Sequence, residues 1–399
     1  MKDIVMYNKL LIIIFALHNK ILPILKNTVM FDSYNGQYND NPKYISECLH
    51  NINPFITIVW TTSKHGHEMA PSYCKIVIYK SLKYYYYLNC AAVVVDNYIG
   101  IRNFGFKNFY SKMLYKIVNN NNQLCISTWH GTPLKKIGKD IIQHSVNNYY
   151  TCTDYCIVGC KYTADILENA YLLNNKILFC GTPRNDILVK SITNVTKIKQ
   201  KLRLPLNKKI ILYAPTFRET INLSGIDQIK ILKFDEIINK LKLVFGGDFI
   251  FVFRVHHGML EKIDINKILK DYKGIVYNGN IGDDMAEYLK CTDVLITDYS
   301  GSLFDFALTK KPCFLFAPDR NHYEYIERGF YMNYDTLPFP IANTYTELIN
   351  CINNFSEKDY IDNIDNFLNR IGNIEDGYAS ERVASIVNHF LITGSKQFI

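Results

Sequence analysis

Short β-rich runs alternate with helical stretches along most of the chain, and this alternation constrains the fold more than any other feature of the sequence. The runs form two series, separated by a polar, Lys-containing stretch at residues 193–205. Strands that alternate with helices form parallel sheets, because each helix carries the chain back across the sheet. The expected strands are 28–31, 56–60, 75–78, 92–95 and 124–128 in the first series, and 209–213, 249–253, 274–276, 294–297 and 313–316 in the second.

The two series predict two domains. A chain of 399 residues exceeds the size at which one hydrophobic core usually stops growing. We expect a first nucleotide-fold half at residues 28–190 and a second at 205–376. Ligands of open α/β sheets bind beyond the carboxyl ends of the strands, so the polar residues directly after each strand are the candidates for function.

The formal net charge of +8 favours an anionic partner, such as a nucleotide, a phosphate polymer or an acidic membrane surface. The basic residues are scattered and form no long Lys/Arg run, so nucleic acid is not an expected partner. The 11 Cys contain no CxxC pair, and Cys152, Cys156 and Cys160 are interpreted as buried thiols in a reducing compartment rather than as metal ligands.

The N-terminal segment contains an apolar run at residues 10–17. This run is too short to span a bilayer, which requires about 20 apolar residues. No small-residue cleavage site follows it, as a signal peptide would require. We therefore expect residues 1–27 to form an interfacial membrane helix, with Lys9, Lys20 and Lys26 near acidic headgroups. The alternative is a buried first helix.

His130 follows the expected strand at 124–128, and Gly131 beside it leaves room for a ligand. Histidine has the side-chain pKa nearest to neutral pH, so it suits the role of general base in an attack by a hydroxyl group. The alternative is a structural histidine, which is the commoner role of a single His.

Five further polar residues follow strands of the second series. Arg218 and Arg254 offer planar forks of donors to phosphate oxygens, or else form ion pairs between the domains. Asp298, Ser300 and Ser302 lie where a strand leads into an apolar helix, so they either cradle a diphosphate or simply cap the helix.

Asp319 and Tyr323 follow the last expected strand. They are expected either to contact a ribose or to position the preceding loop.

Nine segments, taken in order, resemble the bacterial CDP-glycerol glycerophosphotransferases of teichoic acid synthesis. Each segment is weak evidence alone, but the ordered set covers nearly the whole chain after residue 28. The segments are MFDSY (30–34), NPKY (41–44), WHGTPLKK (129–136), GTPRND (181–186), YAPTFR (213–218), RVH (254–256), DYS (298–300), RGFY (328–331) and EDGYASERV (375–383).

The resemblance implies a GT-B fold, in which two Rossmann-like domains hold their parallel sheets toward a central cleft. The first domain would bind the acceptor and the second the nucleotide donor. A last helix at about 377–393 would return to the first domain. The resemblance also implies peripheral attachment to the cytoplasmic face of the cell membrane.

The implied reaction transfers glycerol phosphate from CDP-glycerol to a hydroxyl of a teichoic-acid or capsule-type acceptor, which is a lipid-linked polyol phosphate or saccharide, and releases CMP. It requires no metal motif and no cofactor. The alternatives are a ribitol-phosphate or sugar transferase of the same fold, or a non-catalytic nucleotide-binding or membrane-interaction subunit. In the implied site His130 is the general base and His256 a second essential histidine, and the donor-binding residues are Arg218, Arg254, Asp298, Ser300 and Ser302.

Overall fold

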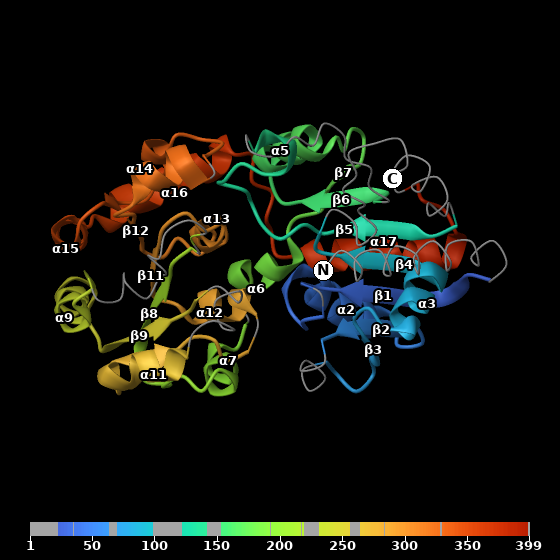
Figure 1. Cartoon of the computed structure of the whole chain (residues 1–399), viewed down its shortest axis with the longest axis horizontal. Coiled ribbons are helices and arrows are strands. Elements are labelled where there is room, and N and C mark those ends of the chain that lie inside the picture. Colours follow the sequence, from blue (N-terminus) through green and yellow to red (C-terminus); the bar gives the residue numbers. More distant parts are fainter. Residues whose placement is uncertain are drawn as a thin grey trace. The chain divides into compact units, whose positions relative to one another are not determined.

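The structure is a computed structural model, and its described part contains two compact units (Figure 1). Unit 1 lies within residues 1–130, 138–186 and 374–399, and unit 2 within 131–137 and 187–373. The chain therefore passes between the units more than once. The described residues are 23–34, 36–63, 70–98, 122–141, 153–191, 193–216, 218, 231–255, 264–282, 284–327 and 329–397.

Unit 1 contains a seven-stranded parallel sheet with the strand order β3-β2-β1-β4-β5-β6-β7. Its strands are β1 (Leu25–Asp32), β2 (Thr57–Thr62), β3 (Lys75–Ile78), β4 (Ala91–Asp96), β5 (Leu124–Ser127), β6 (Tyr155–Val158) and β7 (Ile177–Phe179). Its helices are α2 (Asp40–Ile52), α3 (Leu82–Cys90), α5 (Lys161–Tyr171) and α17 (Ala379–Thr393), and a 3-10 turn, η2 (Pro183–Asn185), precedes the short α6 (Asp186–Val189).

Strand β1 shows how unit 1 buries both faces of its sheet. Val29 and Phe31 pack with Ile45 of α2 and Val387 of α17, whereas Met30 packs with α3 on the opposite face. Successive side chains of a strand point to opposite faces, and a parallel sheet covered on both sides needs apolar residues at every position. Residues close to the C-terminus thus complete the core around the first strand.

Unit 2 contains a six-stranded parallel sheet with the order β10-β9-β8-β11-β12-β13. Its strands are β8 (Lys209–Ala214), β9 (Phe249–Phe253), β10 (Val276–Asn278), β11 (Val294–Thr297), β12 (Cys313–Phe316) and β13 (Ile341–Ala342). Its helices are α7 (Val195–Lys201), α9 (Phe234–Phe245), α11 (Ile265–Leu269), α12 (Met285–Cys291), α13 (Ser302–Ala307), α14 (Arg320–His322), α15 (Tyr345–Asn353) and α16 (Glu357–Arg370).

The core of unit 2 follows the same logic with larger side chains. Phe249, Phe251 and Phe253 of β9 all point to one face and pack with Ile237 of α9 and Leu348 of α15. Aromatic side chains bury large apolar areas, so a three-residue stripe anchors the sheet to its helices.

The prediction of two α/β units with parallel sheets is confirmed. Two strands, β7 and β13, were not predicted, whereas β6 lies in the segment of Cys152, Cys156 and Cys160, which reads mostly as strand. The boundary of the N-terminal segment also requires a correction, because Leu25–Asn27 form the start of β1, where Leu25 pairs with Ala91 of β4, rather than ending a helix. Residues 1–22 of the expected interfacial helix lie outside the described residues. Among the described helices, none has the length and apolarity needed to cross a bilayer.

Candidate functional site

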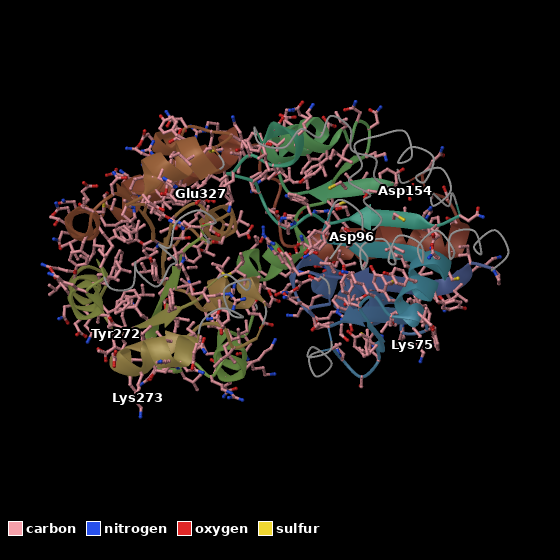
Figure 2. The ribbon with its side chains drawn as sticks, viewed as in Figure 1. Lys75, Asp96, Asp154, Tyr272, Lys273 and Glu327 are labelled. Carbon is pink, nitrogen blue, oxygen red and sulfur yellow. The ribbon has the colours of Figure 1, made fainter. Side chains whose placement is uncertain are left out.

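Parallel pairing of β4 with β5 positions His130. The register pairs Asp96 with Ser127, so the loop after β4 lies beside the residues that lead from β5 to His130. The backbone N–H of Thr128 continues this pairing and donates to the carbonyl oxygen of Asp96 at 2.6 Å. Asp96, at the end of β4, is labelled in Figure 2. The candidate base therefore sits at the carboxyl end of the sheet, as the sequence predicted.

The imidazole of His130 is held by its Nδ1 atom. This nitrogen lies 2.9 Å from the backbone carbonyl oxygen of Asn97. A carbonyl oxygen can only accept, so Nδ1 carries the proton and Nε2 carries the lone pair. An imidazole in this tautomer can accept a proton from a substrate hydroxyl through Nε2, which is the property required of a general base.

Aromatic side chains surround the His130 ring. Its centroid lies 4.0 Å from that of Trp129, 5.9 Å from that of Tyr34 and 6.1 Å from that of Tyr98. Trp129 has a positive φ of 51°, a conformation that costs a non-glycine residue about 1–3 kcal/mol and is often found at functional sites. The surrounding rings therefore limit the orientations of the imidazole.

Asn97 is a member of this site that the sequence did not reveal. It contributes through its backbone carbonyl, which every residue type possesses, so no side-chain pattern could have identified it.

Arg218 and Asp298 are brought together in unit 2. The register of β8 with β11 pairs Ala214 with Thr297, so the residues that follow the two strands are neighbours. Nη1 of Arg218 lies 2.6 Å from Oδ2 of Asp298 and also donates to the carbonyl oxygen of Thr216. Oδ1 of Asp298 accepts from the backbone N–H of Thr216 at 2.8 Å.

Asp319 occupies the other edge of the Arg218 guanidinium. Its carboxylate accepts from Nε at 2.8 Å and from Nη2 at 2.9 Å, and it also accepts from the Tyr299 hydroxyl at 2.9 Å. Burial alone would raise the pKa of Asp319, but the hydrogen bonds and charge of Arg218 hold it below its usual value. Of the two roles predicted for Asp319, this geometry supports the positioning of the loop.

The side chain of Arg218 has 0% exposed surface. Burial opposes its charged form, yet the charges of Asp298 and Asp319 keep its pKa above the ordinary value. In this arrangement the guanidinium is enclosed between the carboxylates of Asp298 and Asp319. The sequence indicated Arg218, Asp298 and Asp319, but not the ion pairs that join them.

Ser300 and Ser302 form the turn between β11 and α13. The hydroxyl of Ser302 donates to that of Ser300 at 2.9 Å, and Ser300 remains half-buried while Ser302 is buried. Gly301 between them faces the carbonyl oxygen of Thr132, and a Cβ atom at this position would lie 2.9 Å from it. The glycine thus permits the close approach of residues 131–137 within unit 2.

Arg254 follows β9 and is half-buried. Its Nη1 donates to the carbonyl oxygens of Gly279 at 2.6 Å and Gly282 at 3.3 Å, and the guanidinium lies 4.8 Å from the centre of the Tyr288 ring. Unlike Arg218, it has exposed surface with which to meet an anion. His256, two residues later, lies outside the described residues.

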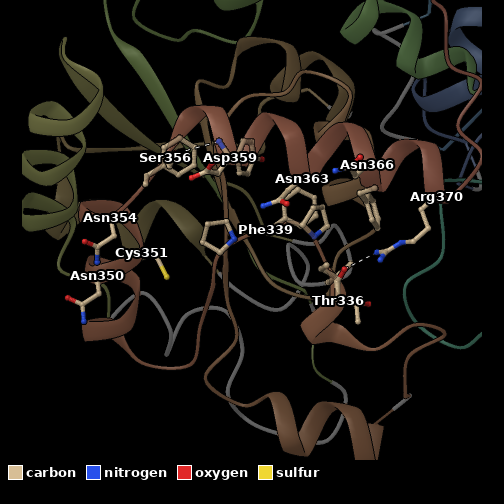
Figure 3. A pocket seen from close by; sticks show the side chains of 16 residues that line it. Thr336, Phe339, Asn350, Cys351, Asn354, Ser356, Asp359, Asn363, Asn366 and Arg370 are labelled. Atoms are coloured by element: carbon tan, nitrogen blue, oxygen red, sulfur yellow. Dashed lines mark hydrogen bonds between the residues drawn. The ribbon is translucent and has the colours of Figure 1, made fainter.

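Unit 2 also contains a hollow of about 770 Å³ between the segment 336–340 and the helices α15 and α16 (Figure 3). The hydroxyl of Tyr360, one of its lining residues, accepts from the backbone N–H of Cys313, the first residue of β12. The hollow therefore lies near the amino end of that strand, opposite the end that carries the predicted site residues. We assign it no part in the candidate site.

Metal ligation finds no support among the residues that the structure describes. They contain no group of three or more His, Cys, Asp and Glu side chains arranged to hold an ion. Cys156 and Cys160 are buried, as the sequence predicted, and burial raises the pKa of Cys156 to about 12. Cys152 lies outside the described residues.

Residues 14–389 match the family model described as CDP-Glycerol:Poly(glycerophosphate) glycerophosphotransferase. A teichoic acid glycerol-phosphate transferase of Staphylococcus aureus is 30% identical, with 91% of this chain and 93% of the relative covered. Teichoic acid poly(glycerol phosphate) polymerases of Staphylococcus epidermidis and Bacillus subtilis are 29% and 30% identical over 90% and 92% of this chain. The chain spans about half the length of these two polymerases.

The fold is similar to that of solved structures of the wall teichoic acid polymerase TagF. One of them, a variant soaked with CDPG, aligns with a TM-score of 0.77 and 28% identity, over 98% of this chain and 96% of that chain. A structure of the Staphylococcus aureus protein MnaA with UDP, at 14% identity and a TM-score of 0.52, shows likeness of fold alone.

Proposed function

This chain belongs to the CDP-glycerol:poly(glycerophosphate) glycerophosphotransferase family, and we propose that it transfers glycerol phosphate from CDP-glycerol to an acceptor hydroxyl with release of CMP. The observation that carries the proposal is the geometry of His130. Its Nδ1 atom bonds to the Asn97 carbonyl, which supports Nε2 as the proton acceptor in a chain that matches the family over residues 14–389.

In the proposed reaction Nε2 of His130 takes the proton from the acceptor hydroxyl. The oxygen then attacks the phosphorus that carries glycerol, a new O–P bond forms, and the bond from that phosphorus to the CMP oxygen breaks in line. CMP leaves with the bonding electron pair. Such transfers depend mainly on positioning and on stabilisation of the charge that develops on phosphate oxygens.

The proposed donor site lies on unit 2. Arg254 and the hydroxyls of Ser300 and Ser302 are the candidates for contact with the diphosphate, because each retains some exposed surface or borders the turn. Arg218 and Asp298 contribute by holding the ends of β8 and β11 in place. On sequence grounds, His256 belongs to the proposal as a second essential histidine on the donor side.

We propose that the acceptor is lipid-linked, that unit 1 binds it, and that the enzyme works peripherally at the cytoplasmic face of the cell membrane. The net charge of +8 supports attraction to an anionic surface. Removal of residues 1–22 should abolish salt-sensitive binding to anionic liposomes in a flotation assay. Unchanged flotation would contradict the assignment of membrane binding to this segment.

His130→Ala tests whether His130 is the general base. We expect CMP release to fall by about 100-fold or more, because a positioned base contributes on the order of 10²–10⁴ in rate. The affinity for CDP-glycerol, measured by calorimetry, should stay the same because the base is proposed to act on the acceptor. His50→Ala is the matched control in unit 1, since the His50 ring stacks on Tyr73 rather than joining this site.

Two outcomes would contradict the proposal. One is full turnover by His130→Ala, which would show that His130 is not the base. The other is a wild-type protein that binds CDP-glycerol but releases no CMP with any acceptor, which would favour a non-catalytic nucleotide-binding subunit.

A further inference from the structure

Two of the sequence segments have no role in the reaction described above. NPKY begins with Asn41 in the first turn of α2, and GTPRND contains Arg184 in the 3-10 turn η2. They are separated by more than 130 residues of sequence, yet both contact the segment that carries His130 in unit 1.

Arg184 joins a carboxylate to the main chain of His130. Its Nη1 atom lies 2.9 Å from Oδ1 of Asp40 and 2.9 Å from the carbonyl oxygen of His130. The side chains of Arg184 and Asp40 are only 11% and 5% exposed. A buried ion pair with this geometry resists displacement, because breaking it would leave a charge without its partner.

Asp40 is also linked to the imidazole of His130, through Asn97. Its Oδ2 atom accepts from the side-chain amide of Asn97 at 3.1 Å, and the backbone carbonyl of Asn97 accepts from Nδ1 of His130 at 2.9 Å. Arg184, Asp40 and Asn97 thus form a closed ring of hydrogen bonds that begins at the main chain of His130 and ends at its side chain.

Asn41 makes a second set of hydrogen bonds between α2, η2 and the residues before His130. Its amide donates to the carbonyl oxygens of Thr128 and Trp129 at 3.2 and 3.1 Å, and its oxygen accepts from the backbone N–H of Arg184 at 3.0 Å. Asn41 has 0% exposed surface. Asn41, the residue after Asp40, therefore fixes Thr128 and Trp129, the two residues before His130.

We propose that Asp40 and Arg184 are positioning residues that hold His130 with Nε2 toward the acceptor hydroxyl. This inference rests on the proposed function, in which His130 is the general base. Neither residue needs to touch substrate. Their charges cancel in the pair, so the imidazole experiences nearly no net charge from this direction while its orientation is fixed.

The charges predict opposite effects on the pKa of the imidazole. Asp40→Asn leaves the positive Arg184 alone, which disfavours the imidazolium and lowers the pKa of His130. Arg184→Met leaves the negative Asp40 alone, which favours the imidazolium and raises that pKa. The double variant removes both charges and should restore the wild-type value.

Other titratable groups near the His130 ring do not produce these opposite shifts of its pKa. Burial, and then the charge of Asp40, raise the pKa of Tyr34 well above its usual value, and burial raises the pKa of Tyr98 to about 12, so both phenols stay neutral near pH 7. Asp96, at the end of β4, is unchanged in all three variants.

The test measures kcat and KM for CDP-glycerol against pH in the full-length protein. Both single variants should lose about 100-fold in kcat, since small displacements of a catalytic group have effects of this size. Their KM for CDP-glycerol should stay within about twofold of wild type, because the donor is proposed to bind elsewhere. In the plot of kcat against pH, the midpoint of the acid limb should move to lower pH by about half a unit or more in Asp40→Asn. In Arg184→Met it should move to higher pH by a similar amount.

Arg382→Met is the matched control. Arg382 is also in unit 1 and also donates to a carboxylate, Asp376, and to a backbone carbonyl, that of Cys180, but it does not contact the His130 network described above. Arg382→Met should have the kcat of the wild type, and the midpoint of its acid limb should lie at the wild-type pH. If all three single variants lose kcat alike with no shift of the acid limb, Asp40 and Arg184 have only a structural role and the proposal fails.

A measurement on the wild type covers the case in which the variants do not fold. In ¹⁵N-histidine-labelled protein, the His130 resonances, assigned through their loss in His130→Ala, should report protonation at Nδ1. Protonation at Nε2 instead would overturn the proposal. Should His130→Ala remain fully active, the proposed base itself is wrong; if His130→Ala is inactive but Asp40→Asn and Arg184→Met behave as wild type, only this inference fails.

Discussion

Arg218 and Arg254 of unit 2 illustrate how the surroundings of a side chain decide whether it supports the fold or can contact a ligand. Both follow strands, and both were predicted to meet the donor. Arg218 is enclosed by two carboxylates and two tyrosine rings, with ring centres 4.9 and 5.4 Å from its guanidinium carbon, whereas Arg254 bonds to backbone carbonyls and stays half-buried. The sequence could not separate them, because Asp298 and Asp319 lie 80 and 101 residues away from Arg218.

Arg218→Met should lower the free energy of unfolding by about 3–5 kcal/mol, because it leaves two buried carboxylates without their cation. Arg254→Met should cost less than about 1 kcal/mol, yet weaken the binding of CDP-glycerol by about tenfold, since it removes a proposed phosphate contact. Urea denaturation and calorimetric titration measure the two effects. Equal stability losses in the two variants would contradict the distinction between support and ligand contact.

At the scale of elements, most strands could be predicted, because runs such as Phe249–Phe253 are long and apolar. The strands that escaped prediction are short. β13 has two residues and β7 has three, so neither is long enough to show a periodic pattern, and their pairing is set by the neighbouring strand.

The turn between β11 and α13 depends on a close approach that only the structure reveals. The segment 131–137 is pinned to unit 2, where the backbone N–H of Lys136 donates to Gly329 and that of Tyr331 to Leu134. Thr132 then faces Gly301. Glycine is required here by space and not by backbone conformation, since its φ is −60°.

Gly301→Ser should therefore destabilise the protein by about 1–3 kcal/mol, the usual cost of forcing extra atoms into a packed site. A shift of the segment 131–137 should accompany the loss and slow turnover, because this segment follows His130 directly. Thermal unfolding and kcat measure the two effects. A serine variant with wild-type stability and turnover would show that residues 131–137 accommodate the added side chain without loss of stability or activity.

At the scale of the whole molecule, the units are not consecutive pieces of the chain. α17 belongs to unit 1 although unit 2 lies between it and the rest of that unit in sequence. Val383, Ala384 and Val387 of α17 are fully buried in the unit 1 core. Composition and periodicity indicate two domains, but the return of the last helix was implied by the family resemblance alone.

Deletion of residues 374–399 should expose this core and unfold unit 1, because each large apolar side chain contributes about 1.5–3 kcal/mol when buried. Hydrogen exchange should show lost protection in β1 and β4, while β8, β9 and β11 of unit 2 keep theirs. Uniform loss across both units would indicate that they do not fold independently, and unchanged protection of β1 would contradict the role of α17.

The central claim concerns the donor and the group transferred. The most direct measurement offers the wild-type protein CDP-glycerol, CDP-ribitol and nucleotide sugars in turn with a polyol-phosphate acceptor, and follows CMP release together with the mass of the acceptor. The proposal expects CMP to appear with CDP-glycerol, in step with the addition of glycerol phosphate units to the acceptor. No CMP from CDP-glycerol, or efficient transfer from CDP-ribitol or a nucleotide sugar in its place, would contradict it.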